Sequence, residues 1–313
     1  MAYKFDMSPN PASLDSPVVR ERILNYGSNT PLTGVFTYHP QHYQRLAPCL
    51  VILNAGVVRK SGPNNLNAFL ARQIAQRGLG VFRFDFAGVG DSPNRQDGLP
   101  LRDGVLRDVT ESLDELEAVV GARRFVLVGL CSGADNGLRA ARIEADRVIG
   151  LAMMDPTVFR TRKWLLVKLA KRLAALDFWK SVLKLRHSRI RALHDPLLGG
   201  PASAKSGTPT VEKPELYTVG LKERDEIEVC LREVRERGVA LCFAFTGSWA
   251  ELYNYRTQLY DVYPALGLEK DVELLYYPAS SHTFAFHEHR RALASDLLRW
   301  LDRFPVAEAA PDS

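Results

Sequence analysis

Gly129-Leu130-Cys131-Ser132-Gly133 is the segment of this 313-residue sequence whose residue types and spacing could do covalent chemistry. It has the pattern Gly-x-nucleophile-x-Gly, with cysteine at the centre. In such a segment the central residue lies on a strained turn between a strand and a helix, and the two glycines let neighbouring backbone pass closely. The positive end of the helix dipole then favours a thiolate. We therefore expect Cys131 to be a nucleophile at a helix N-terminus.

The segments around this motif alternate between strand and helix. Continuous apolar runs, which suit strands covered on both faces, are found at residues 49–53, 80–86, 124–130 and 148–154. Helical patterns separate these runs at residues 66–77, 103–120 and 134–144. Two more short strands are predicted upstream, at residues 17–25 and 32–38. This order predicts an α/β fold with a mostly parallel sheet and helices on both faces.

The alternation is interrupted after residue 156. Residues 157–238 contain a long amphipathic segment, a loop rich in Gly, Pro and Ser, and a helical pattern at 225–237. Strands at residues 240–246 and 271–277 and helices at residues 253–266 and 290–304 follow. We therefore expect a core of residues 1–156 and 239–304, a helical insertion at 157–238, and a disordered tail at 305–313.

Four segments that follow predicted strands resemble those of the α/β-hydrolase superfamily. They are Asn54-Ala55-Gly56, Asp85 to Ser92, the Cys131 motif, and Ser281-His282. Their order and spacing match over roughly residues 17–304. Within the superfamily, the sequence is similar to small bacterial hydrolases that carry Asn-Ala-Gly where others carry His-Gly, and a cysteine as the nucleophile. The resemblance implies an α/β-hydrolase fold in which residues 157–238 form a helical cap, or lid.

The resemblance also implies roles for single residues. Cys131 would be the nucleophile, and His282 the general base that takes its proton and later protonates the leaving group. The family usually places the acid that orients this histidine after the penultimate strand, where Glu251 is the first carboxylate. A minority arrangement uses the turn after the preceding strand, which offers Asp155. We expect a Cys131, His282, Glu251 triad, with Asp155 as the alternative acid.

An oxyanion hole follows from the same resemblance. One donor would be the backbone N–H of Ser132, directly after the nucleophile. The second would come from the loop after the first central strand, at Gly56, or at Val57 if the alignment shifts by one residue. Asp85 and Asp91 have a structural interpretation, in which they close the turn after their strand.

The predicted insertion carries the basic charge of the chain. Residues 160–194 contain eleven Lys and Arg and one acid, Asp177, a net charge of +10, whereas the whole chain carries +5. Three interpretations remain open: a lid whose apolar face covers the active site, a docking surface for an acidic partner such as an acyl carrier protein or the phosphates of coenzyme A, and an amphipathic helix in peripheral contact with an anionic membrane. Each leaves an apolar pocket, which favours a substrate with a hydrophobic acyl group.

The composition excludes several classes of protein. With 46% hydrophobic and 25% charged residues the chain is ordinary for a globular protein. No uncharged apolar run approaches the roughly 18 residues of a membrane span, and the N-terminal residues lack the apolar segment of a secretory signal. Four cysteines in this length form neither a disulfide framework nor a CxxC metal pair. We expect a reduced, cytoplasmic protein with no cofactor, no metal and no nucleic-acid partner.

The function predicted from these residues is hydrolysis of an ester, thioester or lactone through an acyl-cysteine intermediate. Because an acyl thioester on the enzyme stays activated, the same residues also fit an acyltransferase that passes the acyl group to an acceptor other than water. A second alternative is a non-catalytic binding module that keeps the fold.

Overall fold

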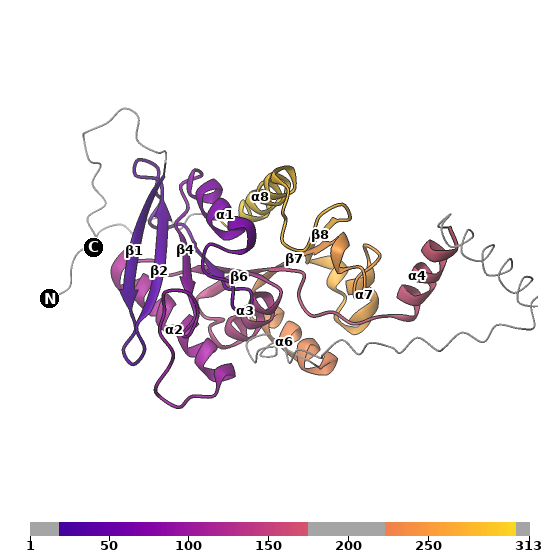
Figure 1. Cartoon of the computed structure of the whole chain (residues 1–313), viewed down its shortest axis with the longest axis horizontal. Coiled ribbons are helices and arrows are strands. Elements are labelled where there is room, and N and C mark those ends of the chain that lie inside the picture. Colours follow the sequence, from indigo (N-terminus) through magenta and orange to yellow (C-terminus); the bar gives the residue numbers. More distant parts are fainter. Residues whose placement is uncertain (1–18, 175–222, 305–313) are drawn as a thin grey trace, which may run out of the picture.

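The computed structural model describes residues 19–174 and 223–304, which form an eight-stranded sheet (Figure 1). The strand order across the sheet is β1-β2-β4-β3-β5-β6-β7-β8, and β2 runs antiparallel to both of its neighbours. The remaining pairs, from β4 to β8, are parallel. The strands are β1 (Arg20–Tyr26), β2 (Leu32–Tyr38), β3 (Cys49–Leu53), β4 (Val81–Asp85), β5 (Phe125–Leu130), β6 (Val148–Met154), β7 (Ala240–Thr246) and β8 (Glu273–Tyr277). The predicted mostly parallel sheet is confirmed.

Helices cover both faces of this sheet. They are α1 (Leu66–Ala75), α2 (Leu101–Val120), α3 (Ser132–Ile143), α4 (Arg162–Ala174), α6 (Arg224–Glu236), α7 (Gln258–Val262) and α8 (His287–Leu301). Short 3-10 turns add η1 (Pro63–Asn65), η3 (Gly247–Trp249), η4 (Pro264–Leu266) and η5 (Leu268–Lys270). Of the predicted insertion, residues 157–174 and 223–238 are described. Residues 175–222 and the predicted tail at 305–313 lie outside the described residues.

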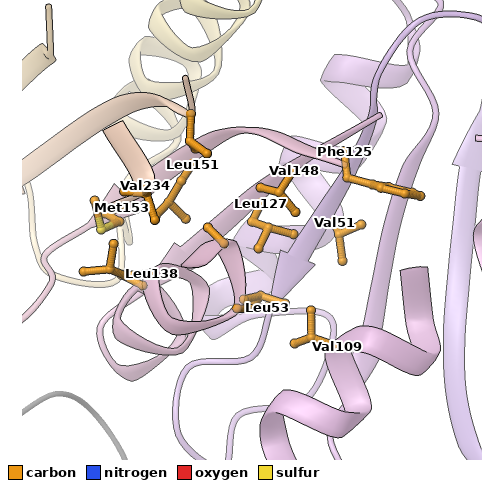
Figure 2. Packing of buried hydrophobic residues seen from close by; sticks show 14 of the residues in the cluster. Val51, Leu53, Val109, Phe125, Leu127, Leu138, Val148, Leu151, Met153 and Val234 are labelled. Carbon is orange, nitrogen blue, oxygen red and sulfur yellow. The ribbon is translucent and has the colours of Figure 1, made fainter. Parts of the chain in front are cut away.

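The core divides into two apolar layers, one on each face of the sheet. Helices α1 and α8 pack on one face, and α2, α3, α6 and α7 pack on the other. Figure 2 shows the second layer, in which Leu53 and Leu127 of the sheet lie near Val109 of α2 and Leu138 of α3. Each such side chain contributes about 1.5–3 kcal/mol when fully buried. The layers hold the central strands rigidly between them.

One predicted helix has a different form in the structure. The pattern at residues 253–266 gives only α7, followed by η4 and η5. Helix α7 ends at Val262 because the next residue, Tyr263, precedes Pro264 and has φ −122° and ψ 59°. A proline disfavours helical geometry at the residue before it.

The parallel strands bring four chain segments to one edge of the sheet. β5, β6, β7 and β8 are consecutive neighbours, so their carboxyl ends point the same way. Cys131 follows β5, Asp155 follows β6, η3 follows β7, and the loop with His282 follows β8. In open α/β sheets this edge is where ligands bind.

Candidate active site

Cys131 occupies a strained backbone position between β5 and α3. Its φ is 55° and its ψ is −124°, a combination that residues with a side chain rarely adopt. The position is held by three backbone hydrogen bonds: the Cys131 N–H donates to the Met154 carbonyl (2.8 Å), and the Cys131 carbonyl accepts from the N–H groups of Ala134 (2.9 Å) and Asp135 (3.3 Å). The side chain is partly exposed, whereas the other three cysteines are buried. Strain of this kind, at a reactive and accessible side chain, indicates a functional site.

The two glycines of the motif are required by backbone contacts. A β-carbon at Gly129 would lie 2.3 Å from the backbone of Gly133. A β-carbon at Gly133 would lie 2.5 Å from the carbonyl oxygen of Asn54, in the loop after β3. Any side chain at either position would therefore push apart β5, α3 and the loop at residues 54–60. The steric reason expected for this spacing agrees with the structure.

His282 lies beside Cys131 in the loop after β8. Its Nδ1 is 2.8 Å from Oδ2 of Asp155, and its ring also makes a side-chain hydrogen bond with Cys131. Since a carboxylate can only accept, Nδ1 carries the hydrogen and Nε2 is left for the sulfur. Burial by itself lowers the pKa of His282, but the hydrogen bonds and charges of Asp155 and Cys131 outweigh it and raise this pKa to about 9. The ring is therefore set to carry a proton beside the Cys131 side chain.

Asp155 is fully buried and is held rigidly at the end of β6. Its φ is 42°, the second strained residue of the site, and its N–H donates to the Ala244 carbonyl (2.8 Å). Its Oδ1 accepts the Thr246 N–H (2.7 Å), and its Oδ2 accepts both the Thr246 hydroxyl (2.6 Å) and His282 Nδ1. A buried carboxylate with these partners can hold one ring orientation and one tautomer of the histidine.

Glu251 does not contact His282, so the prediction that it orients the ring is wrong. Its side chain is 75% exposed and forms an ion pair with Lys168 of α4 (2.8 Å). Gly247 passes so close to Pro278 that a β-carbon there would lie 1.8 Å from the Pro278 carbonyl oxygen, which directs the chain into η3. By residue 251 the chain has left the sheet edge. Asp155, the alternative acid, makes the contact instead.

Of the two predicted oxyanion donors, the Gly56 N–H already has a hydrogen-bond partner within the protein. Ser132 opens α3, so its N–H is one of the helix's first four, which have no partner within the helix. Gly56 lies nearby as expected, but its N–H donates to the Ser132 hydroxyl oxygen (2.7 Å). Val57, the other candidate, is 42% exposed. The Gly56 N–H therefore meets a side chain of the protein rather than open space.

A buried polar network fixes the loop that carries Gly56. The Asp85 carboxylate accepts from the Lys60 N–H (2.5 Å), the Lys60 ammonium (2.7 Å) and the Asp91 N–H (3.1 Å). Asn54 joins the network through its Nδ2, which donates to the Val58 carbonyl (2.7 Å) and to Asp85 (3.3 Å). Lys60 also pairs with the Asp91 side chain. The contacts of Asp85 and Asp91 are those of the structural interpretation.

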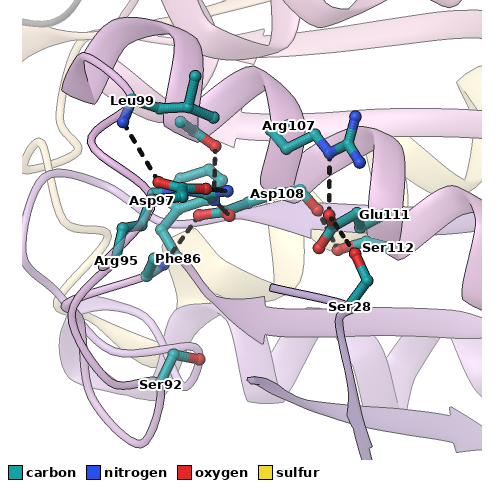
Figure 3. A network of polar contacts seen from close by, with 12 residues as sticks. Ser28, Phe86, Ser92, Arg95, Asp97, Leu99, Arg107, Asp108, Glu111 and Ser112 are labelled. Atoms are coloured by element: carbon teal, nitrogen blue, oxygen red, sulfur yellow. Dashed lines mark hydrogen bonds and ion pairs between the residues drawn. The ribbon is translucent and has the colours of Figure 1, made fainter. Parts of the chain in front are cut away.

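A second network holds the loop after β4 from the side of α2 (Figure 3). Asp108 of α2 accepts the Ala87 N–H (2.8 Å) and pairs with Arg95, which also binds Asp97. Burial raises the pKa of Asp108 to about 6, although the Ala87 N–H and the Arg95 charge oppose the shift. The segment after β4 is thus tied to α2 as well as to the loop at residues 54–60.

Two features of the site were not anticipated from the sequence. Trp249 of η3 stacks on His282, with ring centroids 4.4 Å apart and planes at 10°. Asp135, in the first turn of α3, accepts the Thr157 N–H (3.0 Å) and hydroxyl (2.6 Å), which ties the segment after Asp155 to the helix that follows Cys131. Burial raises the pKa of Asp135 to about 6. Trp249 is the third residue after β7, and its position near a strand end was the one signal that could have identified it.

Helix α4 contacts the domain through three of its basic side chains. Lys163 pairs with Asp261 (3.5 Å), Lys168 pairs with Glu251 (2.8 Å), and Lys171 donates to the Asn254 carbonyl (2.9 Å). Its side chains Leu165, Leu166 and Leu169 are more than half exposed, and Trp164 is the one buried residue of the helix. In this described part of the insertion the leucines therefore do not cover the site.

Solved structures of similar architecture place this geometry in a known fold. An esterase from Pyrococcus furiosus is 13% identical, with 97% of this chain and 99% of that chain covered and a TM-score of 0.60. A serine hydrolase without a lid from Xanthomonas campestris is 16% identical, with 96% and 100% covered and a TM-score of 0.54. A thioesterase domain from the curacin biosynthetic pathway is 15% identical, with 91% and 99% covered and a TM-score of 0.54. The chain has the α/β-hydrolase fold.

Neither family models nor curated sequences add to this comparison. No protein-family model matches the sequence, and no curated protein is similar to it. Within residues 19–174 and 223–304, no group of three or more His, Cys, Asp or Glu side chains could hold a metal ion. In the same ranges, no helix has the length and apolar character needed to cross a membrane.

Proposed function

We propose that this protein hydrolyses an ester or thioester with a hydrophobic acyl group, a lactone being the cyclic case, through an acyl-Cys131 intermediate. The observation that carries the proposal is the continuous contact from the strained Cys131 through His282 to the buried Asp155. Nucleophile, base and orienting acid in hydrogen-bonding sequence are the parts that acyl transfer requires. The proposal replaces Glu251 with Asp155 as the acid. The esterase and thioesterase named among the structural neighbours support the reaction class.

The first half of the reaction forms the acyl-enzyme. The Cys131 sulfur bonds to the substrate carbonyl carbon, and the π electron pair of the carbonyl moves to its oxygen. The Ser132 N–H donates to this oxyanion, where a fixed backbone donor is worth more than water because it needs no reorganisation. His282 then gives its Nε2 proton to the departing alkoxide or thiolate as the carbon–oxygen or carbon–sulfur bond breaks.

The second half returns the enzyme to its starting state. Neutral His282 takes a proton from water at Nε2 while the water oxygen bonds to the thioester carbon. The tetrahedral intermediate collapses, expels the Cys131 thiolate and releases the carboxylic acid. The thiolate and the protonated His282 are left side by side, as before the first step. Asp155 accepts the hydrogen bond from His282 Nδ1 and stabilises the imidazolium at both stages.

Hydrolysis of a panel of substrates tests the proposal. The panel comprises p-nitrophenyl esters and acyl-coenzyme A thioesters of increasing acyl length, with wild type, Cys131→Ala and the control Cys230→Ala, which removes a buried thiol of α6. We expect Cys131→Ala to lose about 10³-fold or more in rate, and Cys230→Ala to stay near wild type. Equal turnover by wild type and Cys131→Ala would exclude the covalent mechanism. Faster product formation with an added amine or alcohol would identify the acyltransferase instead.

A further inference from the structure

The Ser132 side chain is buried and accepts a hydrogen bond from Gly56, the residue predicted to supply the second oxyanion donor. Ser132 directly follows Cys131, is 5% exposed, and has its hydroxyl oxygen 2.7 Å from the Gly56 nitrogen. The Gly56 N–H is thereby occupied by this oxygen. A substrate oxyanion would have to compete with this oxygen for the Gly56 N–H.

A serine hydroxyl accepts and donates at the same time. Ser132 uses one lone pair for the Gly56 N–H, and among the described residues nothing accepts its hydroxyl hydrogen. A buried hydroxyl donor is expected to have an acceptor, and its absence requires an explanation. The backbone N–H of the same residue is also free of partners within α3. Two donors on one residue, adjacent to the nucleophile, are therefore available for a single oxygen.

We propose that Ser132 supplies both hydrogen bonds of the oxyanion hole, one from its backbone N–H and one from its hydroxyl. The inference rests on the proposed acyl-transfer function and adds a catalytic side chain to it. The Gly56 N–H assists the hydroxyl indirectly. By donating to the Ser132 hydroxyl oxygen, it polarises the O–H bond and strengthens the hydrogen bond that the hydroxyl gives to the oxyanion. The Asp85 network holds Gly56 in place for this task.

Two reactions of the same sulfur distinguish this role from a structural one. Acylation by an ester builds negative charge on a carbonyl oxygen, and the loss of one donor to such an oxygen slows the step about 10²–10³-fold. Alkylation by iodoacetamide displaces iodide at a saturated carbon and forms no oxyanion. A residue that serves the oxyanion alone therefore affects acylation and leaves alkylation unchanged.

The experiment measures both rates for wild type, Ser132→Ala and the control Ser112→Ala. Ser112 is also a buried serine, hydrogen-bonded to Tyr26 and far along the chain from the site. We expect Ser132→Ala to acylate about 10²-fold more slowly, with iodoacetamide alkylation of Cys131 within about twofold of wild type. Ser112→Ala is expected to match wild type in both reactions.

Three results would overturn the inference. Unchanged or faster acylation in Ser132→Ala would mean that the hydroxyl only blocks Gly56 and that the Gly56 N–H is the true donor. A parallel loss of acylation and alkylation would mean that Ser132 positions the thiol rather than the oxyanion. Wild type that is alkylated but never acylated would remove the proposed function itself, which separates that failure from the other two.

Discussion

Replacing Asp155 with asparagine removes the carboxylate that, among the residues the structure describes, contacts His282, while keeping the size of the side chain. In the wild type, Oδ1 accepts the Thr246 N–H, and Oδ2 accepts both the Thr246 hydroxyl and His282 Nδ1. An asparagine amide has one oxygen and one NH2 group. Whichever way it turns, an N–H faces either the Thr246 N–H or the His282 Nδ1–H. In the first orientation the Thr246 N–H loses its acceptor and the ring keeps only an uncharged amide oxygen. In the second orientation the ring loses its acceptor or changes its tautomer.

The size of the effect follows from the pKa of His282. This pKa is about 9 against an ordinary value of 6.5, and the hydrogen bonds and charges of Asp155 and Cys131 outweigh burial, which acts in the opposite direction. Without the carboxylate, the pKa of His282 should fall toward its ordinary value, because burial opposes the charge and only Cys131 still supports it. A fall over the whole range from about 9 to 6.5 is the upper limit, and it corresponds to roughly 3 kcal/mol in the stability of the imidazolium, or about 300-fold. We expect kcat/KM of Asp155→Asn to fall by up to about 300-fold.

Two assays with a matched control test this expectation. Glu251→Gln changes an acidic side chain that is 75% exposed and bound to Lys168, so neither the rate nor the pKa of His282 should change. Ester hydrolysis gives kcat/KM, and NMR titration of the His282 ring gives its pKa in each variant. If Glu251→Gln loses activity and Asp155→Asn retains it, the assignment of the acid is refuted. A fall in rate without a fall in the His282 pKa would refute the electrostatic reasoning.

Three further changes probe the same site. Gly133→Ala places a β-carbon 2.5 Å from the Asn54 carbonyl oxygen, so urea unfolding should show a loss of about 1–3 kcal/mol, and an unchanged midpoint would contradict the steric argument. Trp249→Leu removes the aromatic ring stacked on His282. An aromatic pair contributes about 0.5–1.5 kcal/mol, so kcat/KM should fall by roughly 2- to 10-fold, and Trp249→Phe should stay nearer to wild type. Equal rates for the two variants would mean that the ring only fills space. Acylation should slow as pH rises past about 9, because His282 then loses the proton that it gives to the leaving group. The raised pKa of His282 also stabilises the fold; this contribution should be complete below about pH 6.5 and should be lost as the pH rises through about 9. Acylation that keeps rising above that pH would contradict this.

The arrangement of the nucleophile and the histidine could be predicted from the sequence because strand order determines it. Apolar runs of five to seven residues marked the central strands, and parallel neighbours bring their carboxyl ends to one edge. Cys131 directly follows β5, so there is little chain in which its path can deviate. His282 stands five residues beyond β8, as far as Glu251 stands beyond β7, and its position was predicted from the family resemblance. The requirement for glycine at positions 129 and 133 could also be predicted, because it arises from close contacts with backbone atoms rather than from the packing of side chains.

The acid and the second oxyanion donor could not be predicted in the same way. Glu251 stands five residues beyond β7, and the path of that segment is set by the close passage of Gly247 over Pro278. The Gly56 N–H had the expected place in the chain, but its partner depends on the direction of the Ser132 side chain. Such details are decided by packing and rotamers, which leave no periodic signal in the sequence.

Helix α4 shows the limit of composition as a guide. A stripe of leucines among lysines suggests that the leucines face inward. In the structure, Asp261 and Glu251 instead form ion pairs with Lys163 and Lys168 of the helix, and Leu165 and Leu166 are exposed. The orientation depends on acidic partners about 80 to 100 residues away in the chain.

Intact-protein mass spectrometry after brief mixing with an acyl-coenzyme A thioester or a p-nitrophenyl ester tests the central claim most directly. Wild type should gain the mass of one acyl group, and Cys131→Ala should gain none, because the remaining cysteines are buried. Asp155→Asn should gain the same mass more slowly. An adduct of equal size on Cys131→Ala, or no adduct on wild type whose Cys131 is readily alkylated by iodoacetamide, would contradict an acyl-Cys131 intermediate.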